Sequence, residues 1–484
     1  MQQRSKWIRS APALVVVLLM RARFVFAPIT SDEGGYLAVA RGWSRGLTLY
    51  RDVWVDRPQA LLVVFRAINA VGLGNPVGVR LLAIAFALVG TYACGSIAAS
   101  LVGEPARAYA AICAGALISV PKYEGFIANG ELLSGAAGAA GLAILLYSFL
   151  HRTRPWQRGL FLSGVVGAFA MGMKQSGFDA MATGIAALTI ASLVGQRSQR
   201  RARLFGLLSV GAGFLVPFSL MAVHGALTGW HRWWFAIIGY RSQSRSALEN
   251  ANWNNFVGTW KVVEPVVLPA MVVLFAASVG FIRRGHARTL IVFVTWLLLA
   301  FIAFLSGGQF FRHYWIILMF PLSTMLGAML STIPVPSLRR VAFAAVLVGP
   351  AVLTIAALTV PRSQIGHRLI DDPRLSKDED IAKWFDQHRA PGDQIYALCA
   401  AGGLYGNVTT DPPYPYLWFD SVHQMPDGQS RLDAMFESPH PPRFVAEYQT
   451  PLLCNPSGAV LNSLTLRYHI VATIDDIHVY ELSS

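Results

Sequence analysis

Two adjacent carboxylates, Asp32 and Glu33, follow an apolar run in the stretch FAPITSDEGGYLAVARG, which covers residues 26–42. Thr30 and Glu33 have the spacing of a capping box, so Glu33 has a structural use beside a candidate catalytic one. Asp32 is not needed for such a box. A carboxylate at this position is suited to take a proton from a hydroxyl group or to contact a cation, which makes Asp32 the leading catalytic candidate.

Two later segments place cations at the ends of apolar runs. Lys174 stands in AMGMKQSGFDAM, and Arg312 with His313 stands in GGQFFRHYW. A cation at membrane depth is costly unless it meets an anion or a water-filled cavity, and a guanidinium group matches phosphate well. We therefore expect Lys174 and Arg312 to contact an anion, with anchoring at lipid headgroups as the alternative for Arg312.

The composition decides the solvent in which these groups lie. The chain of 484 residues is 54% hydrophobic and 14% charged, with a mean hydropathy of +0.47. Its net charge of +14 is uneven, because residues 1–360 hold 31 Lys and Arg against 10 Asp and Glu, whereas residues 361–484 hold 9 against 16. The basic excess belongs to the apolar part, which indicates a multi-pass membrane protein in the lipid bilayer rather than a nucleic-acid-binding protein.

Apolar windows long enough to cross about 30 Å of hydrocarbon, or nearly so, predict about 11 transmembrane helices. The windows are 8–29, 78–102, 108–121, 132–150, 159–173, 177–195, 204–223, 262–282, 289–306, 313–333 and 341–360.

Basic residues fall in every second connection between these windows, as the positive-inside rule predicts for cytoplasmic loops. The N-terminus is therefore expected inside the cell and residues 361–484 outside it. Of the 10 acids in residues 1–360, only Glu104 is then cytoplasmic, so the chemistry should face outward from the plasma membrane.

The first outer loop is expected to carry two interfacial helices within residues 30–76. Apolar residues recur at helical spacing after Thr30, with Arg41 and Arg45 opposite, which is typical of a helix lying flat at the outer leaflet. Residues 59–74 are marginal for a span and predict a second interfacial or re-entrant helix, with Pro58 at its start. The connection over residues 224–260 is rich in Trp, Tyr, Arg and Asn, which favours an aromatic belt or a share of acceptor recognition.

Beyond residue 360 the composition becomes that of a soluble domain. Helical patterns near residues 376–389 and 430–438 alternate with strand patterns in QIYALC, RFVAEY and HIVATIDDIHVYEL, so residues 361–484 predict a small α/β domain. Its stretch DPPYPYLWF predicts an aromatic loop packed on the membrane part, and we assign no site there. Cys399 and Cys454 share this domain, where oxidising conditions would permit a disulfide.

The outer-loop stretch DEGGYLAVARG, followed by YRD and DRP and then by RLLAIAFALVGTYACG, resembles the GT-C superfamily of membrane glycosyltransferases. The resemblance is to the branch that contains protein O-mannosyltransferases and lipid A aminoarabinose transferases. It implies a polyprenyl-monophosphate sugar donor and transfer to an acceptor outside the cytoplasm, with inversion at the sugar carbon.

The resemblance also implies roles for single residues. Asp32 corresponds to the first-loop acid of the family, and Asp56 with Arg57 to its second-loop pair. Glu131 falls where the family has an acid and is a third catalytic candidate, although an acid capping the next helix is an equal interpretation. Relatives make Asp56 a candidate contact for a divalent metal ion, although "DRPQ" departs from their pattern.

Together these assignments predict a mechanism. The carrier phosphate would lie among Arg57, Lys174, Arg312 and His313, which stabilise the charge on the leaving group. Asp32 would take the proton from an acceptor hydroxyl of a lipid, a cell-wall glycan or a protein, or would position an acceptor that is already ionised. The alternatives are a secondary transporter or lipid-sugar flippase and a non-catalytic binding module. The donor sugar, a hexose or a pentose, is not fixed by the sequence.

Overall fold

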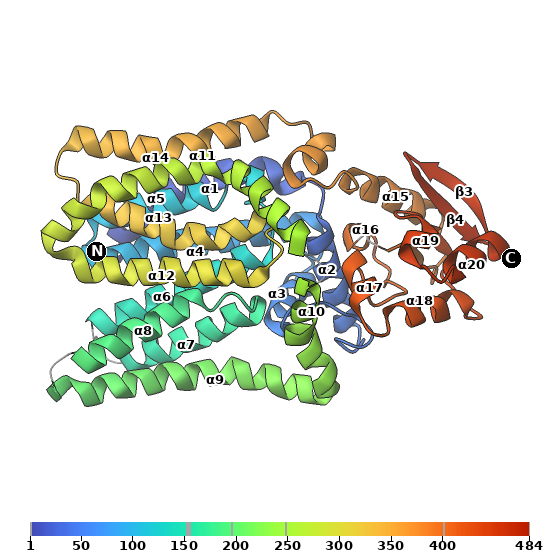
Figure 1. Ribbon diagram of the computed structural model, residues 1–484, viewed down its shortest axis with the longest axis horizontal. Helices are drawn as coiled ribbons and strands as arrows, with labels where there is room; N and C mark the ends of the chain where they lie inside the picture. The colour runs from blue at the N-terminus through green and yellow to red at the C-terminus, as the bar shows by residue number, and fades with distance from the viewer. Residues whose placement is uncertain (1, 152–155, 195–196, 247–248, 400–401, 484) are drawn as a thin grey trace.

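The computed structural model describes the chain except residues 1, 152–155, 195–196, 247–248, 400–401 and 484. It consists of a long helical bundle, at the left in Figure 1, and a smaller part with a β-sheet at the right, which ends at the C-terminus. The two parts meet where α2 lies against α16 and where α10 (Tyr240–Ser246) lies against α17.

Each of the 11 predicted apolar windows falls on a helix of the bundle. These helices are α1 (Gln2–Arg21), α4 (Pro76–Val102), α5 (Pro105–Leu117), α6 (Gly130–His151), α7 (Trp156–Met173), α8 (Asp179–Val194), α9 (Arg197–Trp234), α11 (Glu249–Phe281), α12 (Ala287–Gly307), α13 (Ile316–Ser331) and α14 (Pro336–Leu358).

Not all of these helices have the length and hydropathy of a membrane span. Among the residues that the structure describes, 6 helical stretches qualify, or up to 7 if the bent pair of α1 and α2 is one span. The chain therefore has the apolar helices of a membrane protein, and the count of 11 spans stays a prediction.

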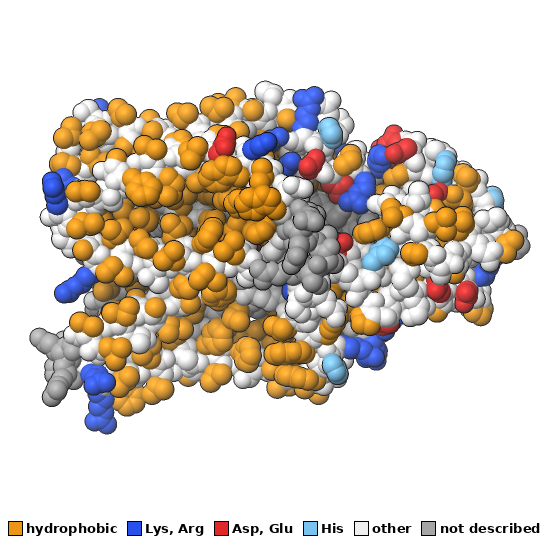
Figure 2. All heavy atoms as spheres, in the orientation of Figure 1, with side chains coloured by type: hydrophobic (Ala, Val, Ile, Leu, Met, Phe, Trp, Pro, Cys, Tyr) orange, Lys and Arg blue, Asp and Glu red, His pale blue; other side chains and the backbone are white. Residues whose placement is uncertain are grey.

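Helix α13 is the centre of the bundle, because 94% of its apolar window is buried, whereas α9 and α14 expose most of theirs. Figure 2 shows the resulting apolar surface along the bundle. Small residues let the helices approach closely: an added Cβ at Gly135 of α6 would strike the ring of Phe320 in α13. This packing fixes the ends of α6 and α13, where Glu131 and His313 lie.

Two short helices cap the end of the bundle that faces the C-terminal part. After α1 the chain bends by 76° into α2 (Ser31–Ser44), and α3 (Gln59–Ala70) follows after a loop. The prediction that this helix lies flat at the outer leaflet, with its basic residues on the outer face, is wrong in one respect. Helix α2 is buried from Glu33 to Gly42. The cause is α16, which covers the face that was expected to meet water.

The C-terminal part combines short helices with a four-stranded sheet of order β1-β2-β4-β3. Strands β1 and β2 are parallel, and the pairs β2–β4 and β3–β4 are antiparallel. Cys399 and Cys454 form a disulfide within it. The elements are α15 (Leu375–His388), β1 (Ile395–Ala397), α16 (Gly402–Asn407), α17 (Phe419–Gln424), α18 (Gly428–Glu437), β2 (Phe444–Ala446), α19 (Pro451–Cys454), α20 (Ala459–Arg467), β3 (Tyr468–Ile474) and β4 (Ile477–Leu482).

The glycines of DEGG explain how this part docks on α2. A Cβ on Gly34 would overlap the carbonyl oxygen of Gly402 in α16, and a Cβ on Gly35 would lie 2.5 Å from the ring of Trp418. Only glycine permits so close an approach. Gly34 and Gly35, which follow Asp32 in α2, therefore allow the C-terminal part to pack closely against the bundle.

Candidate active site

A polar cavity of about 130 Å³ lies where the bundle meets the C-terminal part. Its lining comes from α2, from the loop before α3, from α10 (Tyr240–Ser246), from the segment before α13 and from the C-terminal part. The lining residues are Asp32, Trp54, Asp56, Arg57, Tyr240, Arg241, Gln309, Phe311, His313, Tyr314, Trp418 and Asp420.

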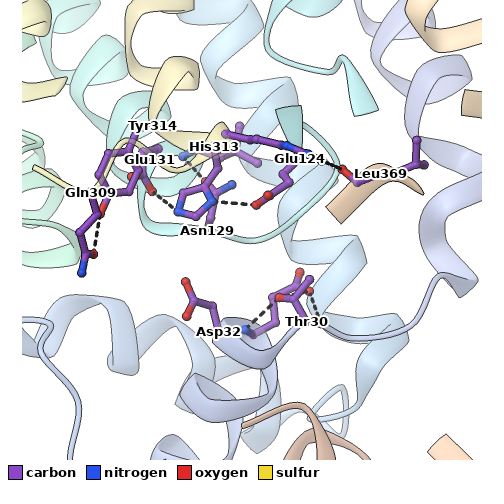
Figure 3. Close-up of polar contacts among 12 residues, drawn as sticks. Thr30, Asp32, Glu124, Asn129, Glu131, Gln309, His313, Tyr314 and Leu369 are labelled. Carbon is purple, nitrogen blue, oxygen red and sulfur yellow. Dashed lines mark hydrogen bonds and ion pairs between the residues drawn. The ribbon is translucent and has the colours of Figure 1, made fainter. Parts of the chain in front are cut away.

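Asp32 lines this cavity from the first turn of α2. The Tyr36 hydroxyl donates a hydrogen bond to Oδ2 at 3.3 Å, and the Trp418 indole Nε1 donates to Oδ1 at 3.0 Å. In Figure 3 the side chain lies across from Glu131, His313 and Tyr314. The structure thus places the leading catalytic candidate in the cavity, with one donor on each oxygen.

Glu33 points elsewhere and serves the fold. Its Oε2 accepts from the backbone N–H and the hydroxyl of Thr30, at 3.1 and 3.0 Å, which completes the predicted capping box. Its Oε1 accepts from Arg80 Nη1 at 2.6 Å and from the Ala128 N–H at 2.8 Å. The wholly buried pair with Arg80 ties α2 to α4, and Glu33 does not line the cavity. The geometry therefore supports the structural role of Glu33 over the candidate catalytic one.

Two guanidinium groups flank Asp56 in the cavity. Arg57 Nη1 lies 2.6 Å from Asp56 Oδ1, and Arg241 forms an ion pair with Oδ2. Burial alone would raise the pKa of Asp56, but the charges of Arg241 and Arg57 outweigh it and hold this pKa below its usual value. Asp56 is therefore an ionised counter-ion between two cations.

Some hydrogen-bond donors of the residues that line this cavity are unpaired. Among the described residues, the buried Nε of Arg57 and the buried Nε1 of Trp54 have no hydrogen-bond partner. Buried donors without partners are costly unless a ligand or water satisfies them. Arg57 lies in the cavity, and its contact with a phosphate stays a prediction. Arg241 was not singled out, because its only signal was a basic residue in the aromatic connection over residues 224–260.

The residues around Asp56 do not fit a metal site. Within the described part of the chain, no group of three or more His, Cys, Asp and Glu residues is arranged to hold a metal ion. Both oxygens of Asp56 instead face guanidinium groups.

A chain of alternating charges lies beside the cavity wall (Figure 3). His313 lines the cavity; its Nδ1 is 2.7 Å from Glu124 Oε2, and its Nε2 is 3.9 Å from Glu131 Oε2. Glu131 also forms an ion pair with Lys174, whose Nζ lies 4.1 Å from the centre of the Tyr314 ring. Lys174 and Glu131 are buried and do not line the cavity, so they stand one layer behind it.

Arg312 turns away from the cavity, unlike its neighbour His313. Its Nη2 lies 3.1 Å from Asp371 Oδ2, and its Nη1 donates to the Leu369 carbonyl oxygen at 3.3 Å. The predicted contact of Arg312 with an anion in this site is not what the geometry supports. The guanidinium groups that line the cavity are those of Arg57 and Arg241.

Trp418 and Asp420 reach the cavity from the loop DPPYPYLWFD, where the sequence indicated packing but no site. Burial raises the pKa of Asp420, although His423 and Arg241 offset part of the effect. Tyr416 from the same loop packs edge-on against Trp54, with ring centres 5.6 Å apart. The missed signal was the combination of three prolines, aromatic residues and two acids in one segment.

The cavity at the end of the apolar bundle is lined by guanidinium groups, carboxylates and aromatic rings, an arrangement that suits a ligand with an anionic group. No protein-family model matches the chain, and no curated protein matches it by sequence. Solved structures do match it, over nearly its whole length.

The fold is similar to that of three solved membrane glycosyltransferases of the GT-C superfamily. ArnT, a lipid A aminoarabinose transferase from Cupriavidus metallidurans solved with undecaprenyl phosphate, is 15% identical, with a TM-score of 0.64 over 98% of this chain and 97% of that one. The oligosaccharyltransferase AglB from Archaeoglobus fulgidus, solved with an inhibitory peptide and dolichol-phosphate, is 10% identical, with a TM-score of 0.58 over 100% of this chain and 75% of that one.

The mycobacterial arabinofuranosyltransferase AftD is 17% identical, with a TM-score of 0.51 over 100% of this chain and 42% of that one. The resemblance expected from DEGGYLAVARG and the motifs after it is therefore confirmed in the fold. At these identities the likeness concerns the fold, and the reaction has to be argued from the site.

Proposed function

We propose that this protein is a glycosyltransferase that moves a sugar from a polyprenyl-monophosphate carrier to an acceptor outside the cytoplasm, with inversion. The observation that carries the proposal is the cavity in which Asp32 faces the cations Arg57 and Arg241. The solved relatives with this fold bind undecaprenyl phosphate or dolichol-phosphate, which supports a lipid-linked donor. The acceptor is a hydroxyl of a lipid, a cell-wall glycan or a protein.

The phosphate of the carrier binds at Arg57 and Arg241. Both guanidinium groups line the cavity, where a phosphate oxygen can contact them. As the bond from the sugar carbon C1 to the phosphate oxygen breaks, its electron pair passes to the phosphate. Cations held in place beforehand stabilise that charge without reorganisation. Lys174 and His313 add positive potential from behind and beside the site.

The acceptor binds on the side of Asp32. Its hydroxyl oxygen attacks C1 from the face opposite the phosphate, and the proton of the hydroxyl passes to Asp32. One displacement of this kind inverts the configuration at C1. The Tyr36 hydroxyl and the Trp418 indole hold the carboxylate toward the incoming hydroxyl.

The test is release of free undecaprenyl phosphate by the purified protein in lipid. Undecaprenyl phosphate linked to glucose, mannose, galactose or arabinose serves as donor, and a membrane extract supplies acceptors. We expect release that requires the extract and identifies the sugar. Asp32→Asn should lower the rate by roughly 100-fold or more, because general-base catalysis contributes about 10²–10⁴-fold.

Asp52→Asn is the matched control, because Asp52 lies in the same outer loop but does not line the cavity. It should retain the wild-type rate. Equal rates in Asp32→Asn and wild type would rule out the base assignment. No release with any donor, from folded protein that binds undecaprenyl phosphate, would favour a flippase or transporter.

A further inference from the structure

The indole of Trp418 is the only side chain that carries a hydrogen bond from the described C-terminal part to Asp32. Its Nε1 donates to Asp32 Oδ1 at 3.0 Å, across 386 positions of sequence. The other oxygen accepts from Tyr36, which lies one turn along the same helix. One contact to the carboxylate is thus local, and the other depends on how the C-terminal part docks.

A second observation shows that α2 is shaped to receive this indole. Gly35 leaves the space that the ring occupies, since a Cβ there would lie 2.5 Å from Cζ2 and 2.8 Å from Cη2 of Trp418. The Trp418 ring also packs tilted against the Tyr36 ring, with centres 6.0 Å apart. Trp418 is therefore held by contacts with Gly35 and Tyr36, which lie about one turn after Asp32 in α2.

We propose that Trp418 is a positioning residue for the reaction, through which the C-terminal part completes the active site by fixing the carboxylate of Asp32. This inference rests on the proposed function and names a further residue of the same site. The indole N–H occupies Oδ1 and fixes the rotation of the carboxylate, so that the remaining lone pairs face the acceptor. A reacting group that is misplaced by about 1 Å can cost about 10²-fold in rate.

The test compares Trp418→Phe with wild type in the release assay. Phenylalanine keeps an aromatic ring attached to Cβ but removes the N–H donor and the outer ring, whose Cζ2 and Cη2 lie nearest Gly35. We expect kcat to fall by roughly 10–100-fold, while KM for the donor and the affinity for undecaprenyl phosphate change less than twofold. Trp384→Phe, the same substitution in α15 of the same part and away from the cavity, should leave kcat unchanged.

Gly35→Ala provides an independent variant, because the added methyl group displaces the indole and leaves its N–H intact. Gly35→Ala should also lower kcat. In the Asp32→Asn background, Trp418→Phe should cause no further loss, because the group that it positions is absent. A packing defect alone would lower the residual rate again.

The outcomes separate this inference from the proposed function. An active wild type whose kcat is unaltered by Trp418→Phe and by Gly35→Ala would overturn the role of Trp418 and leave the transferase proposal standing. Loss of undecaprenyl phosphate binding or of thermal stability in proportion to kcat would also overturn it, since the role would then be structural. An inactive wild type that still binds the carrier would reject the proposed function itself.

Discussion

Arg241 and Arg312 illustrate how a single side chain enters or leaves the site. Both are arginines beside aromatic residues at the end of the bundle, but Arg241 is paired with Asp56 in the cavity and Arg312 with Asp371 outside it. A guanidinium group contributes to phosphate binding only where the planar fork reaches the phosphate. The direction in which each side chain points, rather than its place in the sequence, decides which of the two arginines lines the cavity.

We predict that Arg241→Gln weakens the binding of undecaprenyl phosphate by roughly tenfold or more, because one charge-assisted contact contributes about 1.5–3 kcal/mol. Arg312→Gln, the matched substitution outside the cavity, should change the affinity less than twofold. Titration of the protein in lipid nanodiscs with labelled undecaprenyl phosphate measures both constants. An equal loss in the two variants would contradict the placement of the phosphate.

At the scale of elements, α2 is held between the bundle and the C-terminal part. Glu33 fixes it to α4 through Arg80, and Arg41 donates hydrogen bonds to the Tyr405 and Val408 carbonyl oxygens beside α16. Asp32 directly precedes the first of these two anchors. The position of Asp32 therefore depends on elements that are remote in sequence from α2.

Helix α15, which packs against α16, carries a buried acid whose titration should affect this docking. Asp378 Oδ1 accepts from the Tyr448 hydroxyl at 2.6 Å, and Oδ2 has no partner among the described residues. Burial raises the pKa of Asp378 to about 7. In the unfolded chain the pKa of Asp is about 4. The folded state thus keeps the proton that the unfolded state releases.

We predict that the free energy of unfolding of the C-terminal part falls as the pH rises from about 4 to about 7, because the folded state binds more protons in this range. Asp378→Asn should remove this component, so that its stability relative to wild type increases with pH. Thermal unfolding of both proteins at several pH values measures the difference. A difference that does not change with pH would contradict the prediction.

At the scale of the whole molecule, the disulfide closes the segment that presents Trp418 and Asp420. Cys399 and Cys454 are 55 positions apart, and α17, α18 and β2 lie between them. Closing a loop of this length reduces the entropy of the unfolded chain. The bond therefore stabilises the loop that lines the cavity, as well as the sheet behind it.

Cys454→Ser should destabilise the C-terminal part by about 2–5 kcal/mol. It should also lower the temperature at which transfer activity is lost. A reductant should have the same effect on wild type and none on the variant, which controls for effects on the buried thiols Cys94 and Cys113. Heat-inactivation curves with and without reductant provide the measurement, and overlapping curves for wild type would show that the disulfide is dispensable.

Local signals determined a large part of this protein. Each apolar window fell on a helix of the bundle, and Thr30 with Glu33 specified the capping box that begins α2, because both depend on neighbours a few residues apart. The acid Asp32 and the pair Asp56 and Arg57 were also found from the sequence, since charged groups are conspicuous beside apolar runs.

Tertiary structure alone decided which charged groups share the cavity. Arg241, Trp418 and Asp420 reach it from segments far from α2 in sequence, while Arg312 turns outward and α2 is covered by α16. Such contacts depend on how helices and a remote domain pack, which the periodicity of a segment does not encode. The sequence by itself determined the helices and the candidate acids. Long-range packing decided which other residues join those acids in the cavity.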